Sequence, residues 1–208
     1  MSVPVKIAVT KVKCFIDTDE ATSDEPYVLV TGINLKSLVP NVEVTRYGPW
    51  GDVDEGETRT TIPIPPSLAF DPDPSGIIGI FRKPCWGLDG KAATISSPDD
   101  VVLLVSLMEN DDGDVQASRV LVKGAAVTSL AASMSLSRTA RVAKLINDIN
   151  GALQIPTGAP NFDDNIGSTK EFRLSKELLD VNGCKKFKCL TFVGDGGRYQ
   201  VCFEVSKG

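Results

Sequence analysis

The segment VVLLVSLM at residues 101–108 constrains the fold more than any other part of the chain. Only Ser106 interrupts its run of apolar residues, so both faces of a strand built from it carry apolar side chains. A strand of this kind is typical of the centre of a sheet that is covered on both faces. We therefore expect residues 101–108 to form a central, buried strand.

Four other segments have the composition of β-strands. Residues 6–16, 25–33 and 42–51 are rich in β-branched and aromatic residues and are separated by turn-forming residues. Residues 198–206 alternate between apolar and polar side chains, and the GDGG that precedes them is typical of a hairpin turn. The proline-rich residues 62–76 predict an extended surface connection.

The period of the apolar residues changes between these strands. One stripe with helical spacing comprises Val142, Leu145, Ile146, Ile149 and Leu153. A shorter helix is expected upstream, in VTSLAASMSL. We interpret the stripe as core packing, with a surface that contacts a partner or a membrane as the alternative. The fold class that follows is all-β, an antiparallel β-sandwich with a helical insertion around residues 128–155.

The length and the net charge of the chain indicate its domain organisation and the kind of partner it binds. The 208 residues suit a single domain, 1–208, in which 115–160 form an inserted helical segment. A net charge of −5 makes a nucleic acid an unexpected partner. The N-terminal residues lack the apolar run of a signal peptide. We therefore expect a soluble protein that is cytoplasmic or is released without a standard signal peptide.

Histidine and cysteine usage excludes several chemistries. The absence of histidine rules out a Ser-His-Asp triad, a Cys-His dyad and zinc bound by histidine. The five cysteines contain no Cys-x-x-Cys pair, which excludes a zinc ribbon. We expect reduced thiols, buried in strands at Cys14 and Cys202, with a bridge between Cys184 and Cys189 as the alternative.

Three acidic clusters are the main functional feature of the sequence. They are DTDEATSDE at 17–25, ENDDGD at 109–114 and NFDD at 161–164. Carboxylates on loops that face one another repel unless a cation lies between them, and calcium takes six to eight oxygen ligands of this kind. The alternative for each cluster is a solvated turn.

Order and spacing add a resemblance to a known family. DTDEATSDEPYVLV resembles the first calcium loop and the following strand of the synaptotagmin and protein kinase C type calcium-and-lipid-binding domain. LLVSLMENDDGD and NFDDNIGSTKEFRLS resemble the two parts of that family's third calcium loop. In this chain roughly 45 residues separate those two parts, and the loop tip EATS lacks the bulky apolar residues that family members insert into a bilayer.

The resemblance implies a calcium site and its ligands. The candidates are Asp17, Asp19, Asp24, Glu25, Glu109, Asp111, Asp112, Asp114, Asp163 and Asp164. Because Glu25 is an extra residue in the motif, either Asp24 or Glu25 takes the ligand position, with Asp17 or Asp19 as its partner.

The function expected from the sequence is non-catalytic. The chain is predicted to be a calcium-binding module for an anionic lipid at a membrane surface, a glycan or a protein. A calcium-stabilised structural, toxin or assembly component is the first alternative, and a carboxylate-dependent hydrolase is the second. Because the clusters at 109–114 and 161–164 flank the insertion, a shared ion is expected to close the base of that insertion.

Overall fold

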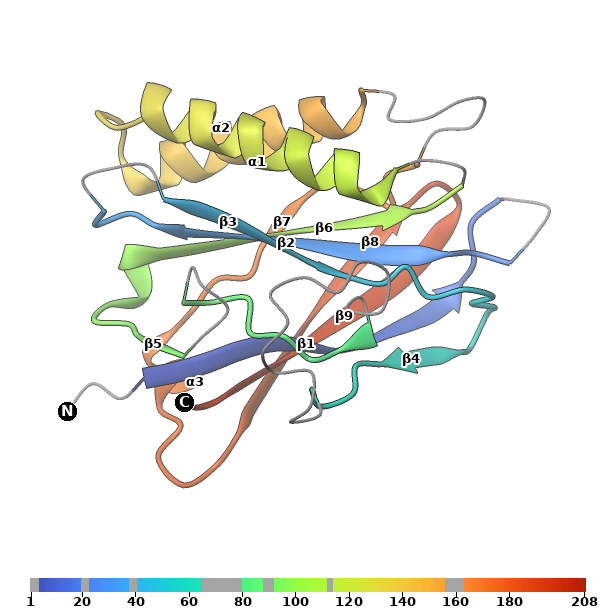
Figure 1. Ribbon diagram of the computed structural model, residues 1–208, viewed down its shortest axis with the longest axis horizontal. Helices are drawn as coiled ribbons and strands as arrows, with labels where there is room; N and C mark the ends of the chain where they lie inside the picture. Colours follow the sequence, from blue (N-terminus) through green and yellow to red (C-terminus); the bar gives the residue numbers. More distant parts are fainter. Residues whose placement is uncertain are drawn as a thin grey trace.

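The computed structural model describes residues 4–19, 23–37, 41–64, 80–87, 92–111, 114–155 and 163–208. These residues form two antiparallel sheets that face each other, with a pair of helices on the outer side of one sheet (Figure 1). The expected sandwich with a helical insertion is confirmed. Most of the proline-rich connection, together with Asp112 and the loop tip at 20–22, lies outside the described residues.

The first sheet has the strand order β4-β1-β9-β8, and the short β5 also pairs with β1. Its strands are β1 (Pro4–Ile16), β4 (Thr58–Thr60), β5 (Ala93–Thr94), β8 (Lys186–Gly194) and β9 (Gly197–Lys207). The β8–β9 hairpin turns at Gly194–Gly197, so the GDGG turn expected from the sequence is confirmed. Because β1 and β9 are antiparallel, this turn lies at the end of the sheet where β1 ends.

The second sheet has the strand order β3-β2-β6-β7. Its strands are β2 (Pro26–Asn34), β3 (Val42–Tyr47), β6 (Val101–Glu109) and β7 (Lys170–Glu171). All nine residues of β6 are buried. Alternate residues of β6 enter two different cores, with Leu103 and Val105 between the sheets and Val102 and Leu104 beneath the helices. This confirms the central strand that the apolar run predicts.

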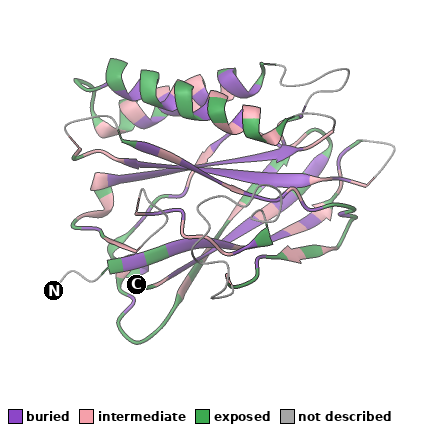
Figure 2. Cartoon of the chain, in the orientation of Figure 1, coloured by how far each residue is buried: buried purple, intermediate pink, exposed green. Residues whose placement is uncertain are grey.

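Two long helices cover the second sheet. Helix α1 spans Val115–Ala132 and α2 spans Arg138–Leu153, while the short α3 spans Lys176–Leu179. The whole predicted stripe of α2 packs against the sheet, and the outer sides of both helices are exposed (Figure 2). The core interpretation of the stripe is therefore confirmed. The helical region begins earlier than the expected residue 128, because Asp114 caps α1 at its N-terminus.

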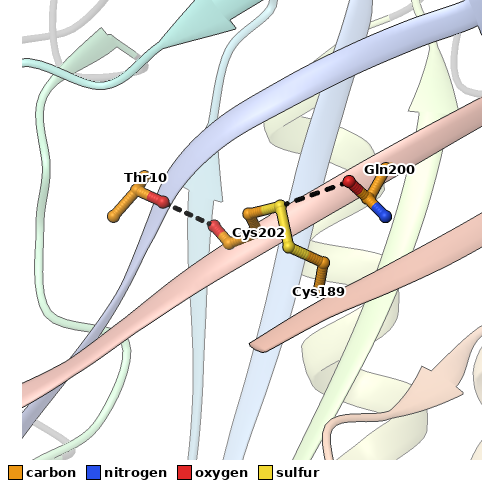
Figure 3. The surroundings of a disulfide bond; sticks show 4 residues. All are labelled: Thr10, Cys189, Gln200 and Cys202. Carbon is orange, nitrogen blue, oxygen red and sulfur yellow. Dashed lines mark hydrogen bonds between the residues drawn. A yellow bond between two sulfur atoms is a disulfide. The ribbon is translucent and has the colours of Figure 1, made fainter. Parts of the chain in front are cut away.

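A disulfide joins the β8–β9 hairpin, so the prediction of reduced thiols throughout is wrong. Cys189 and Cys202 are directly opposite each other in the hairpin register and form the bond (Figure 3). The alternative bridge is wrong as well, because Cys184 is an exposed free thiol. The sequence contained the signal for the correct pair, since Cys189 and Cys202 are equally far from the ends of the GDGG turn.

Candidate metal centre

Loops from both sheets meet at one end of the sandwich. We call this region the loop end and define it by residues 17–19, 23–25, 109–111, 114, 163–167 and 194–197. Hydrogen bonds link the first three loops: Glu25 N donates to Glu109 Oε1 at 3.0 Å, and Glu109 N donates to the Asp164 carbonyl at 2.8 Å. The structure thus brings the three predicted acidic clusters together.

Asp24 is a structural carboxylate in this arrangement. It is fully buried and accepts hydrogen bonds from the Thr18 hydroxyl at 2.7 Å, from Thr18 N at 3.0 Å and from the Tyr199 hydroxyl. Burial, together with the bond to Asp24, raises the pKa of Tyr199, so that its hydroxyl stays protonated as a donor. Protein donors therefore engage the Asp24 oxygens that would otherwise be available to a metal ion.

Glu109 and Asp163 are buried in the same manner. Glu109 accepts the Glu25 amide, and Asp163 Oδ2 accepts the Tyr27 hydroxyl at 2.5 Å. Ser118, at the start of α1, also donates to Asp163 Oδ2 at 3.4 Å. These bonds attach the loops to β2 and to α1 and hold the carboxylates in place.

The other predicted ligands differ in their surroundings. Asp114 is exposed and accepts from Gln116 N and Ala117 N as the cap of α1. Glu25 accepts from the Asn110 side chain at 2.9 Å. Asp17 is half-buried at the end of β1. Asp114 is thus engaged at the start of α1, and Glu25 is engaged by the neighbouring loop.

A second group of carboxylates lies at the surface of the loop end. Burial raises the pKa of Asp164, and the charges of Asp195, Asp111 and Asp163 raise it further. Burial likewise raises the pKa of Asp195, with added repulsion from Asp19, Asp111 and Asp24. We call Asp19, Asp111, Asp164 and Asp195 the outer aspartates. Each of the four loops contributes one of them, and a cation beside Asp164 and Asp195 would offset the repulsion that helps to raise their pKa values.

Asp195 is the functional candidate that sequence reasoning missed, because the GDGG segment was interpreted only as a turn. Asp195 occupies the turn with a φ of 49°, and a Cβ at the neighbouring Gly196 would overlap the Asp19 carboxylate. The signal that could have found it is topological. If β9 pairs with β1 in antiparallel fashion, the start of β9 must lie beside the acidic loop that follows β1.

A pocket of about 360 Å³ opens beside the outer aspartates. Its lining residues are Leu153, Gln154, Ile155, Asp163, Asp164, Asn165 and Asp195. The Asn165 Oδ1 atom is buried and accepts no hydrogen bond from the described part of the chain. An amide oxygen next to carboxylates is a donor set that suits calcium.

The donor chemistry therefore fits a calcium ion, while the placement of the side chains fits it only in part. Among the described residues, no three acidic or cysteine side chains are grouped closely enough to hold one metal ion as they stand. The buried carboxylates are engaged by protein donors. An ion at the loop end would thus depend on the outer aspartates and on Asn165.

The comparisons with known proteins give no relative on which to base a function. No model of a known protein family, no curated protein and no solved structure matches the chain. In the part of the chain that the structure describes, no helix has the length and apolar character needed to cross a membrane. The functional argument rests on the geometry of the loop end.

The raised pKa values predict a specific dependence of stability on pH. A carboxyl whose pKa is higher in the folded than in the unfolded chain destabilises the fold above its folded pKa, and this penalty disappears below the unfolded value of about 3.9. In chelator at pH 7, Asp195→Asn should therefore raise stability slightly, by up to about 0.5 kcal/mol. Urea unfolding at pH 7 and pH 3 measures the effect.

The two pH values separate repulsion from turn chemistry. Asparagine also favours the left-handed conformation of this turn, but that benefit does not depend on pH. The gain from removing the charge of Asp195, which burial and repulsion both disfavour, should be present at pH 7 and absent at pH 3. An equal gain at both values would show that the charge of Asp195 does not destabilise the loop end.

Proposed function

We propose that this chain is a calcium-binding β-sandwich that acts as a non-catalytic binding module. The observation that carries the proposal is the position of Asp164 and Asp195. Both have raised pKa values, both face further carboxylates, and both line one pocket with the buried Asn165 oxygen. A divalent cation would remove the repulsion between them.

The residues divide into two roles under this proposal. Asp164, Asp195 and the amide oxygen of Asn165 would hold the ion, and Asp19 and Asp111 would add negative charge beside it. The ion would neutralise the loop end and offer open coordination positions to an anionic ligand. The buried carboxylates would keep the loops in register, a structural role that needs no change of protonation.

An anionic lipid is the ligand class that the surroundings favour. Ile16, Arg198 and Val193 form one cross-strand row next to the turn, and all three side chains are exposed. This row combines a cation with two apolar side chains beside the outer aspartates. A lipid whose anionic headgroup bridges calcium and Arg198 would match it. The hairpin disulfide favours the released form of the protein over a cytoplasmic one, since disulfides persist in oxidising surroundings.

Calcium should stabilise the fold because it would bind only the assembled loops. With a dissociation constant of roughly 10 μM, 1 mM calcium adds ~2.7 kcal/mol. This corresponds to a rise of about 5–10 °C in the melting temperature of a chain of this size. Thermal melts in calcium, in magnesium and in chelator measure the shift, and magnesium should give less than half of it.

A double variant assigns the shift to the outer aspartates. Asp164→Asn/Asp195→Asn should melt at the same temperature with and without calcium. Glu177→Gln/Asp180→Asn removes the same number of charges around α3 and should keep the full shift. Identical melts of the unchanged protein in calcium and in chelator would refute the metal site. Calcium-dependent co-sedimentation with phosphatidylserine vesicles, and not with phosphatidylcholine vesicles, tests the ligand class.

A further inference from the structure

The sequence contains two Asn-Gly pairs, Asn150–Gly151 and Asn182–Gly183. In such a pair the backbone nitrogen of the glycine can attack the side-chain carbonyl carbon of the asparagine, because glycine has no Cβ that hinders the approach. The structure places the two pairs in opposite surroundings, so only one of them is able to react.

The Asn182–Gly183 pair is accessible. Both residues lie in the loop between α3 and β8, and both are exposed. Gly183 has a φ of 83°, and a Cβ built on it would meet no atom within 4 Å. Among the described residues, no backbone acceptor takes the Gly183 N–H. The Gly183 nitrogen is therefore open to solvent and to the neighbouring side chain.

The side chain of Asn182 is also able to move. Its amide donates to the Asp180 carboxylate at 3.0 Å. Both of these side chains are exposed, so water can replace the hydrogen bond between them. The Asn182 carbonyl carbon can thus turn toward the Gly183 nitrogen without opening any part of the core.

The Asn150–Gly151 pair is held on both sides. Gly151 lies inside α2, where each backbone N–H donates to the carbonyl four residues earlier. The Asn150 side chain accepts a hydrogen bond from the backbone N–H of Thr169 at 2.9 Å, and Thr169 is buried. Ring closure at Asn150 would require that α2 open and that the contact with Thr169 break.

We infer that Asn182 is a self-modification site, at which the folded chain deamidates without an enzyme. The Gly183 nitrogen loses its proton to hydroxide and forms a bond to Asn182 Cγ. The bond from Cγ to Nδ2 breaks, and ammonia leaves with a proton from water, which restores the hydroxide. Water then opens the five-membered ring at either of its carbonyls. One opening gives aspartate, and the other gives isoaspartate, in which the backbone runs through the former side chain.

The modification changes the charge of the end of the sandwich where β1 begins. Asn182 lines a pocket of about 380 Å³ there, together with Lys176, Asp180 and Val181. The new carboxylate would replace the donor to Asp180 by a like charge, and it would add one negative charge to the net charge of −5. The reaction needs only water and hydroxide, so it does not depend on calcium or on the proposed binding function.

Incubation of the full chain at about pH 8.5 and 37 °C tests the site. Digestion and mass spectrometry should show a gain of one dalton in the peptide that contains Asn182, and isoaspartate methyltransferase should label the same peptide. Conversion at Asn182 should proceed within about tenfold of the rate in a synthetic peptide of residues 179–186, because the loop needs no unfolding. Conversion at Asn150 should be at least tenfold slower than at Asn182, because α2 must first open.

Two variants separate the site from other sources of charge. Asn182→Gln keeps the amide but would have to close a six-membered ring, so the more acidic species should no longer appear in anion-exchange chromatography. The matched control is Asn150→Gln, which should form that species as fast as the unchanged protein.

Three results would overturn the inference. One is an Asn182 that stays unmodified while the synthetic peptide converts completely. The second is equal conversion at Asn150 and Asn182, which would mean that the fold does not select the site. The third is aspartate at residue 182 without isoaspartate, which would exclude the route through the ring.

Discussion

Leu145→Ala is expected to lower the free energy of unfolding by about 2–5 kcal/mol. Leu145 has no exposed surface and packs in the core between α2 and the second sheet. Its removal leaves a cavity, since the sheet below and α1 beside it are held by their own contacts. Leu29 on β2 and Leu104 on β6 pack in the same core as Leu145. The helical layer is therefore part of the folding unit.

The matched control is Ile155→Ala, just beyond the end of α2, where the side chain is 50% exposed. This change removes aliphatic carbon from the same region without opening a buried cavity. It should cost less than about 0.5 kcal/mol. Urea unfolding of the two variants compares the costs. Equal costs would mean that the helices are attached to the sandwich without sharing its core.

Asp24→Ala should cost about 3–5 kcal/mol when it is measured in chelator. The substitution would leave three buried donors without their acceptor: Thr18 N, the Thr18 hydroxyl and the Tyr199 hydroxyl. Tyr199→Phe, which removes one of these donors and keeps the ring, should cost about 1–3 kcal/mol. Chemical denaturation in the absence of calcium gives both values.

The absence of calcium makes this experiment decisive for the role of Asp24. A carboxylate that serves only as a metal ligand destabilises the metal-free protein, so its removal would raise stability. A structural carboxylate has the opposite effect. Asp17→Ala, on the same loop but half-buried, is the control and should change stability by less than about 0.5 kcal/mol. A gain in stability from Asp24→Ala would return Asp24 to the set of metal ligands.

The strands and the α2 stripe could be predicted because their patterns are local. The apolar run at 101–108 and the alternation at 198–206 each determine which faces of a strand are buried, whatever the neighbouring strand is. The stripe from Val142 to Leu153 determines the buried face of a helix in the same way. The acidic clusters could also be placed at strand ends, because each follows or precedes a strand pattern.

The roles of single acidic residues could not be predicted, because they depend on long-range partners. Asp24 is structural because Tyr199, 175 residues away in sequence, donates to it. Asp163 receives its donor from Tyr27, and Asp114 serves α1, whose N-terminus the sequence pattern placed too late. Asp195 joins the loop end only through the pairing of β1 with β9.

Calorimetric titration of calcium into the full chain tests the central claim most directly. The account predicts saturable binding with a dissociation constant on the order of 10 μM, within the range of protein calcium sites. Glu177→Gln/Asp180→Asn should bind with the same constant, and Asp164→Asn/Asp195→Asn should bind at least tenfold more weakly. Heats no larger than those of dilution, or equal affinity in the Asp164→Asn/Asp195→Asn variant, would contradict the claim that Asp164 and Asp195 hold the ion.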